Sequence, residues 1–326
     1  MKHVIHIFGA SGSGTTTLGR ALAADMGLVH MDTDNYYWLP TDPKFTAKRP
    51  IAERLRMMNA DIDAAKKGVV ISGSLTGWGD VLIPRFTHVI RLTTPTEVRI
   101  DRLRQREYAH FGERIREGGD MYENHLAFLE WAAQYDTGDV AMRSKACHDE
   151  WMKQLPCPQL IAPGDMPLDR LVRSVKQGVF GIRPMYASDY DQLHTLWLST
   201  PGMGLNDLDD SREGIAKYLA RNPRTSFVAT ENGFDIVGAI MCGHDGRRGY
   251  IYHTCVREDR QGEGIGRALV EAALDALKAE GIHKVALASF SRNEKGNAFW
   301  EKMGFITWDD LIYRNKSLTE MVRTDT

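Results

Sequence analysis

A glycine-rich run in the second half of the chain has the residue types that bind a phosphorylated ligand. It follows Tyr250–Val256, which is rich in β-branched and aromatic residues typical of a strand, and precedes an Ala- and Leu-rich stretch typical of a helix. Gly262, Gly264 and Gly266 lack a Cβ, so their backbone can turn tightly and approach a ligand. The first amides of a helix are unpaired and its dipole favours negative charge, so we expect a pyrophosphate here.

A second glycine-rich run lies near the N-terminus, directly after the apolar stretch Val4–Phe8. A strand, then G-x-x-x-x-G-[K]-[ST], then a helix is the layout of a phosphate-binding P-loop. The lysine position holds Thr15, although lysine is the charge that reaches the β- and γ-phosphates. Because the backbone and the Thr16 hydroxyl remain, nucleotide binding is more robust to this change than phosphoryl transfer. The residues expected at the nucleotide are Gly9, Gly12, Ser13, Gly14, Thr15 and Thr16.

Two carboxylates, Asp32 and Asp34, follow the next apolar stretch. Ligands of α/β folds bind at the carboxyl ends of strands, so both are candidates for a site. Residues 1–177 resemble the adenylate kinase and shikimate kinase group of small-molecule kinases. The resemblance implies that Thr16 and Asp32 hold Mg²⁺, that Asp34 faces the phosphoryl acceptor and that Arg49 clamps it. An Asx turn or a helix cap is the alternative for the two aspartates.

Arginines of the next expected helix are candidates for the missing lysine charge. Arg99, Arg102 and Arg106 fall at i, i+3 and i+7, so a helix places them on one face. By the same resemblance, Arg102 and Arg106 would hold the nucleotide phosphates as arginines of a lid helix. The alternative is a solvated face relieved by neighbouring carboxylates. A second departure weakens the kinase interpretation, because many relatives carry an aspartate where this chain has Ser72.

The second half resembles the GNAT N-acetyltransferase superfamily. The pattern Gln261-x-x-Gly264-x-Gly266 matches its coenzyme A pyrophosphate loop, and Asn293–Phe305 matches its second signature. The resemblance implies acetyl-CoA as cofactor, an amine as acceptor and a hydrogen bond from Asn293 to the pantetheine arm. The residues implied at acetyl-CoA are Cys255, Val256, Gln261, Gly262, Gly264, Ile265, Gly266, Arg267 and Asn293.

Side chains of the strand before the glycine run would face the acceptor. Residues of one parity share a face, so Tyr250 and Tyr252 point one way and His253 the other unless a bulge intervenes. In the superfamily the two tyrosine positions look into the acceptor site, and both are candidate catalytic residues; parity makes His253 a packed residue rather than a base. Trp300 occupies the slot of the tyrosine that usually protonates the departing thiolate, and an indole has no comparable proton. Tyr252, Tyr313 or water would supply it, or the thiolate leaves unassisted.

Composition limits the partners and the compartment. With 41 basic and 43 acidic residues the formal charge is −2, which gives no global attraction to nucleic acid or to an anionic membrane. Small-molecule partners are therefore expected: an amine and, for a kinase, a phosphoryl acceptor. The four cysteines have no metal-like spacing and indicate reduced thiols of a cytoplasmic protein. The chain shows no signal-peptide pattern and no apolar run long enough to span a membrane.

The elements that must position these residues fall into two halves. In the first half, strands alternating with helices predict a parallel sheet covered on both faces. In the second, turns at Asn232-Gly233 and Asp245-Gly246 predict hairpins, so the sheet begins antiparallel. The expected fold class is α/β with two domains: a P-loop α/β/α domain over 1–177, a linker over 178–181 and a GNAT mixed-sheet α+β domain over 182–326.

These patterns together predict an acetyl-CoA-dependent N-acetyltransferase acting on an amine, fused to a kinase-like domain that binds ATP or a related nucleotide with Mg²⁺. The acetyl transfer would be direct attack by a neutral amine on the thioester, with no metal needed. Two alternatives stay open. One is a bifunctional small-molecule kinase and acetyltransferase. The other is a nucleotide- and coenzyme A-binding regulatory protein with little catalysis, for which Trp300 leaves room.

Overall fold

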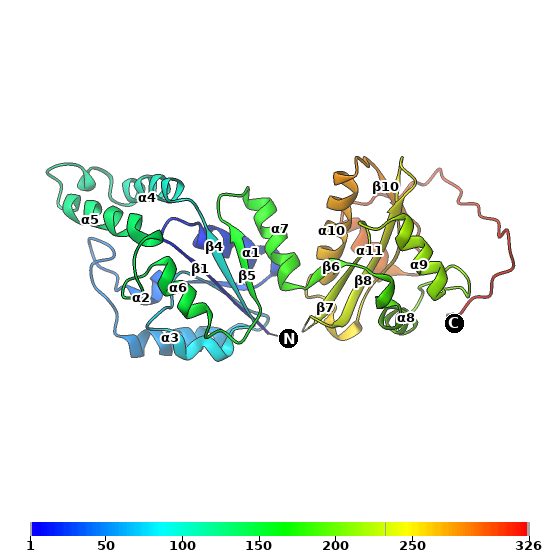
Figure 1. The fold of residues 1–326 in the computed structure, drawn as a ribbon, viewed down its shortest axis with the longest axis horizontal. Helices are drawn as coiled ribbons and strands as arrows, with labels where there is room; N and C mark the ends of the chain where they lie inside the picture. The colour runs from blue at the N-terminus through cyan, green and yellow to red at the C-terminus, as the bar shows by residue number, and fades with distance from the viewer. Residues whose placement is uncertain (1, 232, 325–326) are drawn as a thin grey trace. The chain divides into compact units, whose positions relative to one another are not determined.

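The computed structural model describes residues 2–231 and 233–324. By its internal contacts the chain divides into two compact units, Met1–Val175 and Lys176–Thr326 (Figure 1). Each unit has its own sheet and its own hydrophobic core. The helix α7 (Leu168–Val179) begins in the first unit and ends in the second, and it includes the first two residues of the expected linker.

The first unit is built on a parallel sheet of order β2-β3-β1-β4-β5. Its strands are β1 (His3–Gly9), β2 (Val29–Asp32), β3 (Gly68–Ser72), β4 (His88–Thr93) and β5 (Gln159–Pro163). β1 and β3 are buried along their whole length, which explains their nearly continuous apolar sequences. The predicted parallel sheet is confirmed, with β1 at its centre.

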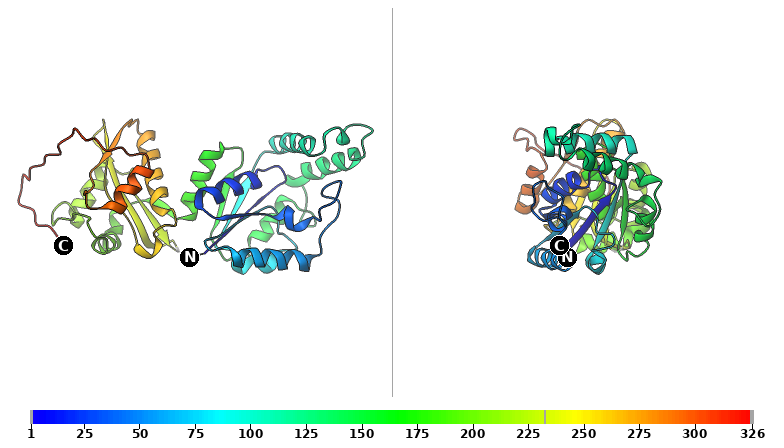
Figure 2. Two further views of the ribbon diagram at one scale, coloured as in Figure 1. Left: turned by 180° about the vertical axis from the view of Figure 1, so that it is seen from behind. Right: turned by 90° about the vertical axis from the view of Figure 1, so that its left-hand side faces the viewer.

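Helices cover both faces of this sheet (Figure 2). The helix α1 (Thr15–Met26) packs on one face, where its Gly19 meets Ser72 of β3. Val69 and Ile71 of β3 point to the other face and join a core with Met58. The helices are α1 (Thr15–Met26), α2 (Thr33–Tyr37), α3 (Ile51–Ala64), α4 (Thr96–Phe111), α5 (Tyr122–Ala133), α6 (Lys145–Met152) and α7, with 3₁₀ turns η1 (Asp80–Arg85), η2 (Gly112–Ile115) and η3 (Gln134–Asp136).

The second unit holds a mixed sheet of order β10-β9-β8-β7-β6. Its strands are β6 (Ile182–Pro184), β7 (Phe227–Glu231), β8 (Asp235–His244), β9 (Gly249–Val256) and β10 (Val285–Leu287). β6 to β9 pair antiparallel, and β10 joins β9 in parallel over Gly249–Ile251 alone. The predicted mixed sheet is confirmed; Asn232, in the first predicted hairpin turn, lies outside the described residues.

Opposite faces of β8 contact different helices of the second unit. Gly238 faces Ile265 and Leu269 of α10 (Ile265–Ala279), whereas its neighbour Ala239 belongs to a core with the fully buried Trp197 of α8 (Tyr190–Leu198). The helices are α8 (Tyr190–Leu198), α9 (Arg212–Arg221), α10 (Ile265–Ala279) and α11 (Glu294–Lys302), with 3₁₀ turns η4 (Ala187–Asp189) and η5 (Glu258–Arg260). After α11 the described chain runs to position 324 without a helix or regular strand, apart from an isolated bridge between Arg323 and Asn206.

The cysteines are free thiols, as their spacing predicts. Burial raises the pKa of Cys255 to about 12, so its sulfur is protonated at neutral pH and is not a nucleophile. In the two described ranges, every helix is too short or too polar to traverse a lipid bilayer.

Candidate functional site

The glycine loop of the second unit leaves its amides open at the start of α10. Gly264 is the N-terminal cap residue of that helix, and Gly262 and Gly264 have φ values of +78° and +96° that glycine adopts without strain. No described residue accepts a hydrogen bond from the amides of Gly262, Gly264 or Gly266. The rings of Phe180 and Phe299 flank the loop, 3.7 and 3.6 Å from where Cβ atoms of Gly264 and Gly266 would lie. Open amides at the positive end of a helix dipole suit an anion.

The end of β9 presents a backbone amide that the sheet does not use. Arg257 donates its amide to the Val237 carbonyl at 2.8 Å, and Val256 is paired with Gly238. In an antiparallel ladder this makes the Gly238–Val256 pair non-hydrogen-bonded, so the Val256 amide points away from β8. The Val256 amide therefore points toward the β10 side of β9, where β10 pairs only with Gly249–Ile251 and does not reach Val256. Gln261 Nε2 donates to the Val256 carbonyl at 3.0 Å, which ties the strand end to the glycine loop.

A bulge in β9 changes which side chains share a face. The register of β8 and β9 shifts between Ile240 and Cys242, and β9 has one residue more than β8 across the shift, at Tyr252 and His253. Beyond the extra residue the alternation of side chains is reversed. The prediction that Tyr252 and His253 face opposite ways is therefore wrong, because a bulge leaves no mark in the alternation of the sequence.

The aromatic contacts of the two residues agree with this reversal. The Tyr252 ring lies 5.5 Å from Tyr218 of α9, and the His253 ring lies 5.1 Å from Trp197 of α8, both measured between ring centroids. Both helices follow the same face of the sheet, since Leu196 of α8 and Leu219 of α9 belong to one core. A histidine thus joins the face on which the two tyrosines were expected.

His253 is oriented by Asp210, in the loop between α8 and α9. Its Nε2 lies 2.6 Å from Asp210 Oδ1, and the two side chains are only 12% and 5% exposed. Asp210 Oδ2 accepts the Asn206 amide at 2.8 Å, which holds the carboxylate in place. In a neutral imidazole the nitrogen that faces the carboxylate carries the hydrogen, so Nδ1 of such a ring would be the proton acceptor. The two residues are 43 positions apart, and no sequence pattern links them.

Tyr250 and Tyr252 lie together on this face. Their ring centroids are 4.7 Å apart. Burial raises the pKa of both phenols, and the phenol of Tyr313 in the C-terminal segment raises them further. Both hydroxyls are therefore protonated at neutral pH and are hydrogen-bond or proton donors. Their catalytic roles stay predictions.

Three other residues expected near acetyl-CoA have partners of their own. The Trp300 ring packs 5.1 Å from Phe305, in the segment where the family places a tyrosine. Asn293 Oδ1 caps α11 by accepting a backbone amide at 3.0 Å, which leaves only its NH₂ group for a ligand. Arg267 Nε donates to Glu271 Oε1 at 3.0 Å on the first turns of α10.

The P-loop of the first unit has the same organisation at the start of α1. Gly14 is the N-terminal cap residue, with φ of +98°, and Gly12 has φ of +80°. A Cβ on Gly12 would lie 2.5 Å from the Arg99 carbonyl oxygen, so only glycine fits there. The amides of Gly12, Gly14 and Thr15 have no acceptor in the part of the chain that the structure describes. Arg102 Nη1 lies 3.7 Å from where a Cβ of Gly14 would be.

Thr16 and Asp32, the residues expected to hold Mg²⁺, are in contact. Thr16 Oγ1 donates to Asp32 Oδ2 at 3.0 Å, and Asp32 Oδ1 also caps α2 by accepting the Asp34 amide at 3.1 Å. A hydroxyl and a carboxylate fit Mg²⁺, which takes its remaining ligands from water and phosphate. Within residues 2–231 and 233–324, no three His, Cys, Asp or Glu side chains are placed to hold a metal by themselves.

Asp34 lies between charges of both signs. Burial raises the pKa of its carboxyl and the Asp32 carboxylate raises it further, whereas Arg106 and Arg143 lower it. The Asp34 side chain is exposed to solvent. The predicted role of Asp34 toward a phosphoryl acceptor stays a prediction.

The arginines expected on one face of α4 have different surroundings. Arg102 Nη1 donates to the Gly164 carbonyl at 2.9 Å, beside the P-loop. Arg99 is fully buried and pairs with Asp136 at 2.7 Å, so it is structural and does not belong to a phosphate-facing row. Arg106 is half exposed. Spacing alone did not distinguish these environments.

Arg49, expected to clamp the acceptor, uses its guanidinium inside the protein. It donates to the Tyr36 carbonyl at 3.0 Å, to the Trp38 carbonyl at 3.3 Å and to Glu53 at 2.7 Å. These bonds tie the segment between α2 and α3 to α3. A clamping role would require some of them to break.

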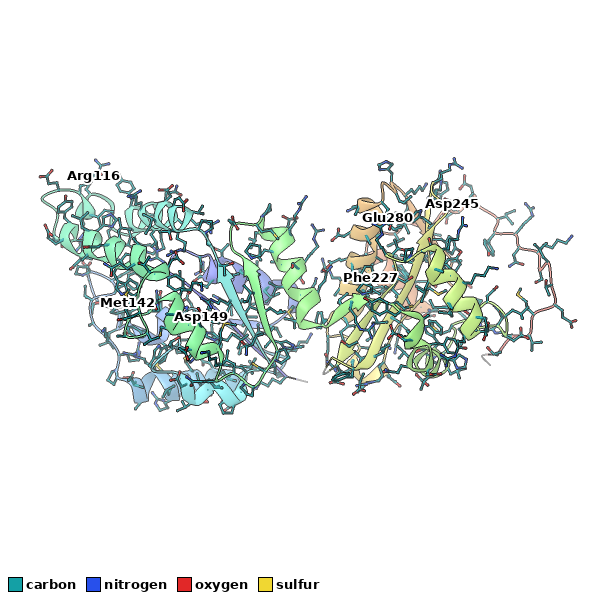
Figure 3. All side chains as sticks on the ribbon, in the orientation of Figure 1. Arg116, Met142, Asp149, Phe227, Asp245 and Glu280 are labelled. Atoms are coloured by element: carbon teal, nitrogen blue, oxygen red, sulfur yellow. The ribbon has the colours of Figure 1, made fainter. Side chains whose placement is uncertain are left out.

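Arg143 is a residue of the first unit that no sequence pattern singled out. It follows Met142, which Figure 3 labels, and precedes α6. Its Nη2 donates to Ser11 Oγ in the P-loop, 132 positions earlier in the chain. A cation therefore reaches the loop from a part of the sequence that carries no motif.

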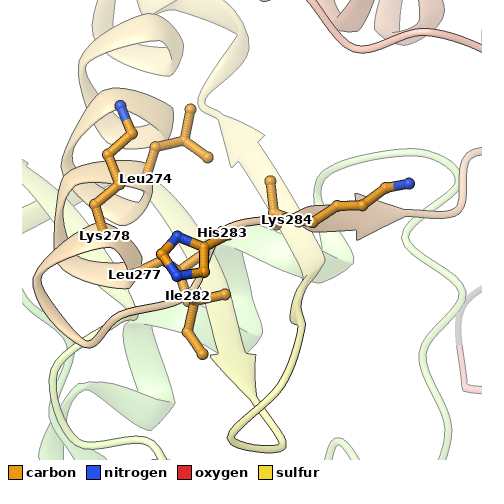
Figure 4. A pocket seen from close by; sticks show the side chains of 7 residues that line it. Leu274, Leu277, Lys278, Ile282, His283 and Lys284 are labelled. Carbon is orange, nitrogen blue, oxygen red and sulfur yellow. The ribbon is translucent and has the colours of Figure 1, made fainter.

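One hollow of the second unit is separate from these sites. It is lined by Leu274, Leu277, Lys278, Ile282, His283, Lys284 and Val285 (Figure 4). It lies at the C-terminal end of α10, about 20 Å along the helix from the glycine loop. None of its lining residues belongs to either expected site.

The comparisons with known proteins agree with this division. The Acetyltransferase (GNAT) family is matched over residues 190–305, and an AAA domain is matched over residues 5–121. Acetyltransferase SG1711 of Sodalis glossinidius (strain morsitans) is 31% identical over 139 residues, which is 43% of this chain and 96% of that protein. The chain belongs to the GNAT acetyltransferase family by its second half, and its first half carries a P-loop domain. It is an acetyltransferase.

Two further similarities also cover most of the other protein. The YqaC protein of Bacillus subtilis (strain 168) is 44% identical over 175 residues, which is 54% of this chain and 96% of that protein. Among solved structures, the PaiA N-acetyltransferase from Thermoplasma acidophilum in complex with coenzyme A is 17% identical with a TM-score of 0.35. That similarity covers 39% of this chain and 90% of the other.

Proposed function

We propose that the second unit transfers the acetyl group of acetyl-CoA to a small-molecule primary amine. The unpaired Val256 amide carries the proposal, because it lies at the end of β9 beside the open amides of the glycine loop. The loop would hold the pyrophosphate of the cofactor, and the Val256 amide would donate to the acetyl carbonyl. Membership of the GNAT family supports the same cofactor.

His253 is the proposed base of this reaction. An amine of the lysine type has a pKa of about 10.4, so at neutral pH it must lose a proton before it attacks. His253 Nδ1 would accept that proton, and Asp210 would stabilise the imidazolium. The amine nitrogen then bonds to the acetyl carbon, the carbon–sulfur bond breaks, and the thiolate leaves with the electron pair. Tyr252 or water would return a proton to the thiolate, since the Trp300 indole has none to give.

The acceptor side favours a cationic amine. The faces of Tyr250 and Tyr252 attract an ammonium group, and the exposed Asp209 carboxylate lies close enough to Tyr252 to raise its pKa. An amine that arrives charged would thus be held before His253 deprotonates it. The nearly buried pair of His253 and Asp210 would then lie next to the reacting nitrogen.

Release of free coenzyme A from acetyl-CoA tests the proposal. The amines to compare are lysine, spermidine, tyramine, an aminoglycoside and a peptide with a free N-terminus. We expect at least one to raise thiol release above the hydrolysis measured without amine. Release that no amine raises would oppose acetyl transfer to a small amine and favour the alternative of a binding protein with little catalysis.

A second candidate function belongs to the first unit, which we propose binds ATP or a related nucleotide with Mg²⁺. The contact between Thr16 and Asp32 and the open P-loop amides support it. Thr15 and Ser72, in place of the lysine and aspartate of relatives, favour a nucleotide sensor over the bifunctional alternative. Formation of ADP with a phosphoryl acceptor would support the kinase. A nucleotide that stabilises without turnover would support the sensor; at 100 times its Kd the gain is about 2.7 kcal/mol.

A further inference from the structure

We propose that Arg143 supplies the P-loop with the positive charge that Thr15 lacks, by binding a phosphate oxygen of the nucleotide. The inference rests on the proposed nucleotide binding of the first unit and adds to it a residue and a charge requirement. Without a lysine the loop offers a phosphoanhydride only backbone amides and a helix dipole. A guanidinium beside the loop restores the cation, and its planar fork matches the geometry of phosphate oxygens.

Two side chains hold Arg143 at the loop, and a third fixes the backbone next to it. Its Nη2 donates to Ser11 Oγ of the P-loop. Its guanidinium carbon lies 4.8 Å from the ring centroid of Trp131 in α5. The next residue, Ser144, is the N-cap of α6 and accepts the Cys147 amide at 3.0 Å, which fixes the backbone beside Arg143. The position is therefore built into the fold and is not that of a free surface cation.

The protein leaves this guanidinium incompletely satisfied. Arg143 Nε is buried and has no hydrogen-bond partner among the described residues. Burial lowers the pKa of Arg143, and the nearby Asp34 carboxylate compensates in part. Arg143 as a whole is half-buried, and a buried donor without a partner is costly. A phosphate oxygen would give the guanidinium an anionic partner.

The charges around the loop also favour an anion. Arg106 and Arg143 both act on the Asp34 carboxyl, and the two guanidinium groups repel one another. Asp32 is committed to Thr16 and to the expected Mg²⁺. Arg106 also pairs with Glu107 at 3.4 Å, so the cation near Asp34 that is open to a ligand is Arg143, next to the positive end of the α1 dipole. This arrangement favours an anion over a neutral ligand.

The other arginines near the loop have different positions. Arg102 is bonded to the Gly164 carbonyl at the Gly14 end of the loop. Arg99 is fully buried and pairs with Asp136. Arg143 is bonded to Ser11, which lies nearer the other end of the loop.

Binding titrations on the full chain test the inference with MgATP, MgADP, magnesium pyrophosphate and inorganic phosphate. Arg143→Met should weaken MgATP binding about 10- to 100-fold, as expected for one charge-assisted hydrogen bond. Arg143→Lys keeps the positive charge but lacks the planar guanidinium. Its affinity for MgATP should lie between those of the unmodified chain and Arg143→Met. The control is Arg116→Met, because Arg116 is an exposed side chain paired with Glu113 (Figure 3). The MgATP affinity of this variant should match that of the unmodified protein. Pyrophosphate binding with the same dependence would identify the phosphoanhydride, and not the nucleoside, as the recognised group.

A lysine at position 15 gives a specific readout. If Arg143 replaces that lysine, Thr15→Lys in the Arg143→Met background should regain at least about tenfold in affinity. In the unmodified background Thr15→Lys should gain less than about threefold, because a cation is already present. If Arg143→Met does not fold, the comparison of Thr15→Lys with the unmodified chain still tests the inference. A gain of about tenfold in affinity in that comparison would overturn it.

The outcomes separate the two proposals. If the unmodified chain binds none of the four phosphates, nucleotide binding fails and the inference fails with it. If the unmodified chain binds and Arg143→Met binds equally well, only the role of Arg143 is refuted. A loss confined to Arg143 variants and repaired by Thr15→Lys would support both.

Discussion

At the scale of single residues, position rather than residue type decides which histidine is suited to catalysis. His253 and His244 lie on the same sheet, and each is bonded to a carboxylate, Asp210 at 2.6 Å and Glu280 at 2.8 Å. His253 alone of the two shares its face with the paired tyrosines. A neighbouring carboxylate orients each ring, and the fold decides which ring lies beside the tyrosines.

Replacement of the proposed base should slow acetyl transfer in a pH-dependent way. His253→Gln should lower kcat about 10²- to 10³-fold at pH 7, the usual contribution of a general base. Near pH 10 the loss should shrink, because the amine is then largely deprotonated without help. Steady-state rates with the best amine over pH 6.5 to 10 measure this.

The matched control for this prediction is His244→Gln, which removes a histidine–carboxylate pair elsewhere on the sheet and should leave the rates unchanged. Asp210→Asn should act in the same direction as His253→Gln, because the amide favours the wrong tautomer. An equal loss for His253→Gln at every pH would argue for a structural role instead of a base.

At the scale of elements, both expected anion sites are strand, glycine loop and helix start, and each depends on backbone conformation. Gly264 and Gly14 cap their helices at φ of +96° and +98°. Residues with side chains rarely adopt such angles, so the glycines are needed for the turn itself. The bulge in β9 is a second backbone feature, and it brings His253 to the face of the sheet that carries Tyr250 and Tyr252.

A side chain at the cap of α10 should abolish cofactor binding. Gly264→Glu adds backbone strain and a negative charge where the pyrophosphate is expected, so affinity for coenzyme A should fall at least about 100-fold. Gly281→Glu is the matched control, because Gly281 also has positive φ, +76°, but has open space around it and follows the far end of the helix. Calorimetric titration with coenzyme A distinguishes them. Unchanged binding by Gly264→Glu would refute the location of the site.

At the scale of the whole molecule, the two units have separate cores and should respond to separate conditions. The core of the first unit contains buried histidines. Burial lowers the pKa of His6 to about 4 and that of His148 to about 3, so both are neutral in the folded state at neutral pH. His6 Nε2 donates to the Gly73 carbonyl at 2.8 Å, and His148 Nδ1 bonds to the Tyr135 hydroxyl at 2.9 Å.

These histidines should make the first unit sensitive to acid. In the unfolded chain each titrates near 6.5, so below that pH the unfolded state binds more protons than the folded state. The stabilisation is complete above pH 6.5 and declines as the pH falls toward 4, by about 2 kcal/mol per histidine at pH 5. Thermal unfolding between pH 7.5 and 5 at constant ionic strength should show the loss.

His148→Phe tests the cause of this sensitivity. The variant removes one buried titrating ring, so the slope of stability against pH should decrease even if stability at pH 7.5 falls through loss of the Tyr135 hydrogen bond. His110→Gln is the control, because His110 is exposed at the end of α4 and should leave the slope unchanged. An unaltered slope in His148→Phe would assign the acid sensitivity to other groups.

Much of the fold was predictable because local patterns determine it. The apolar stretches before Gly9 and Asp32 and the hairpin around Gly246 specify strands through side-chain burial and turn chemistry, which depend on neighbours in the chain. The glycine spacings specify the two loops in the same way. The alternation of side chains gave the wrong face for His253. The bulge that reverses the alternation arises from the pairing of β9 with β8, which the sequence pattern does not show.

The sequence alone therefore determined the two classes of α/β unit and the glycine loops, because strand, turn and helix-start chemistry is local. Tertiary structure alone decided that Asp210 orients His253, that Arg99 is structural and that Arg143 reaches Ser11. The physical reason is distance along the chain. Contacts between residues 43 or 132 positions apart arise from packing, and no spacing rule in the sequence encodes them.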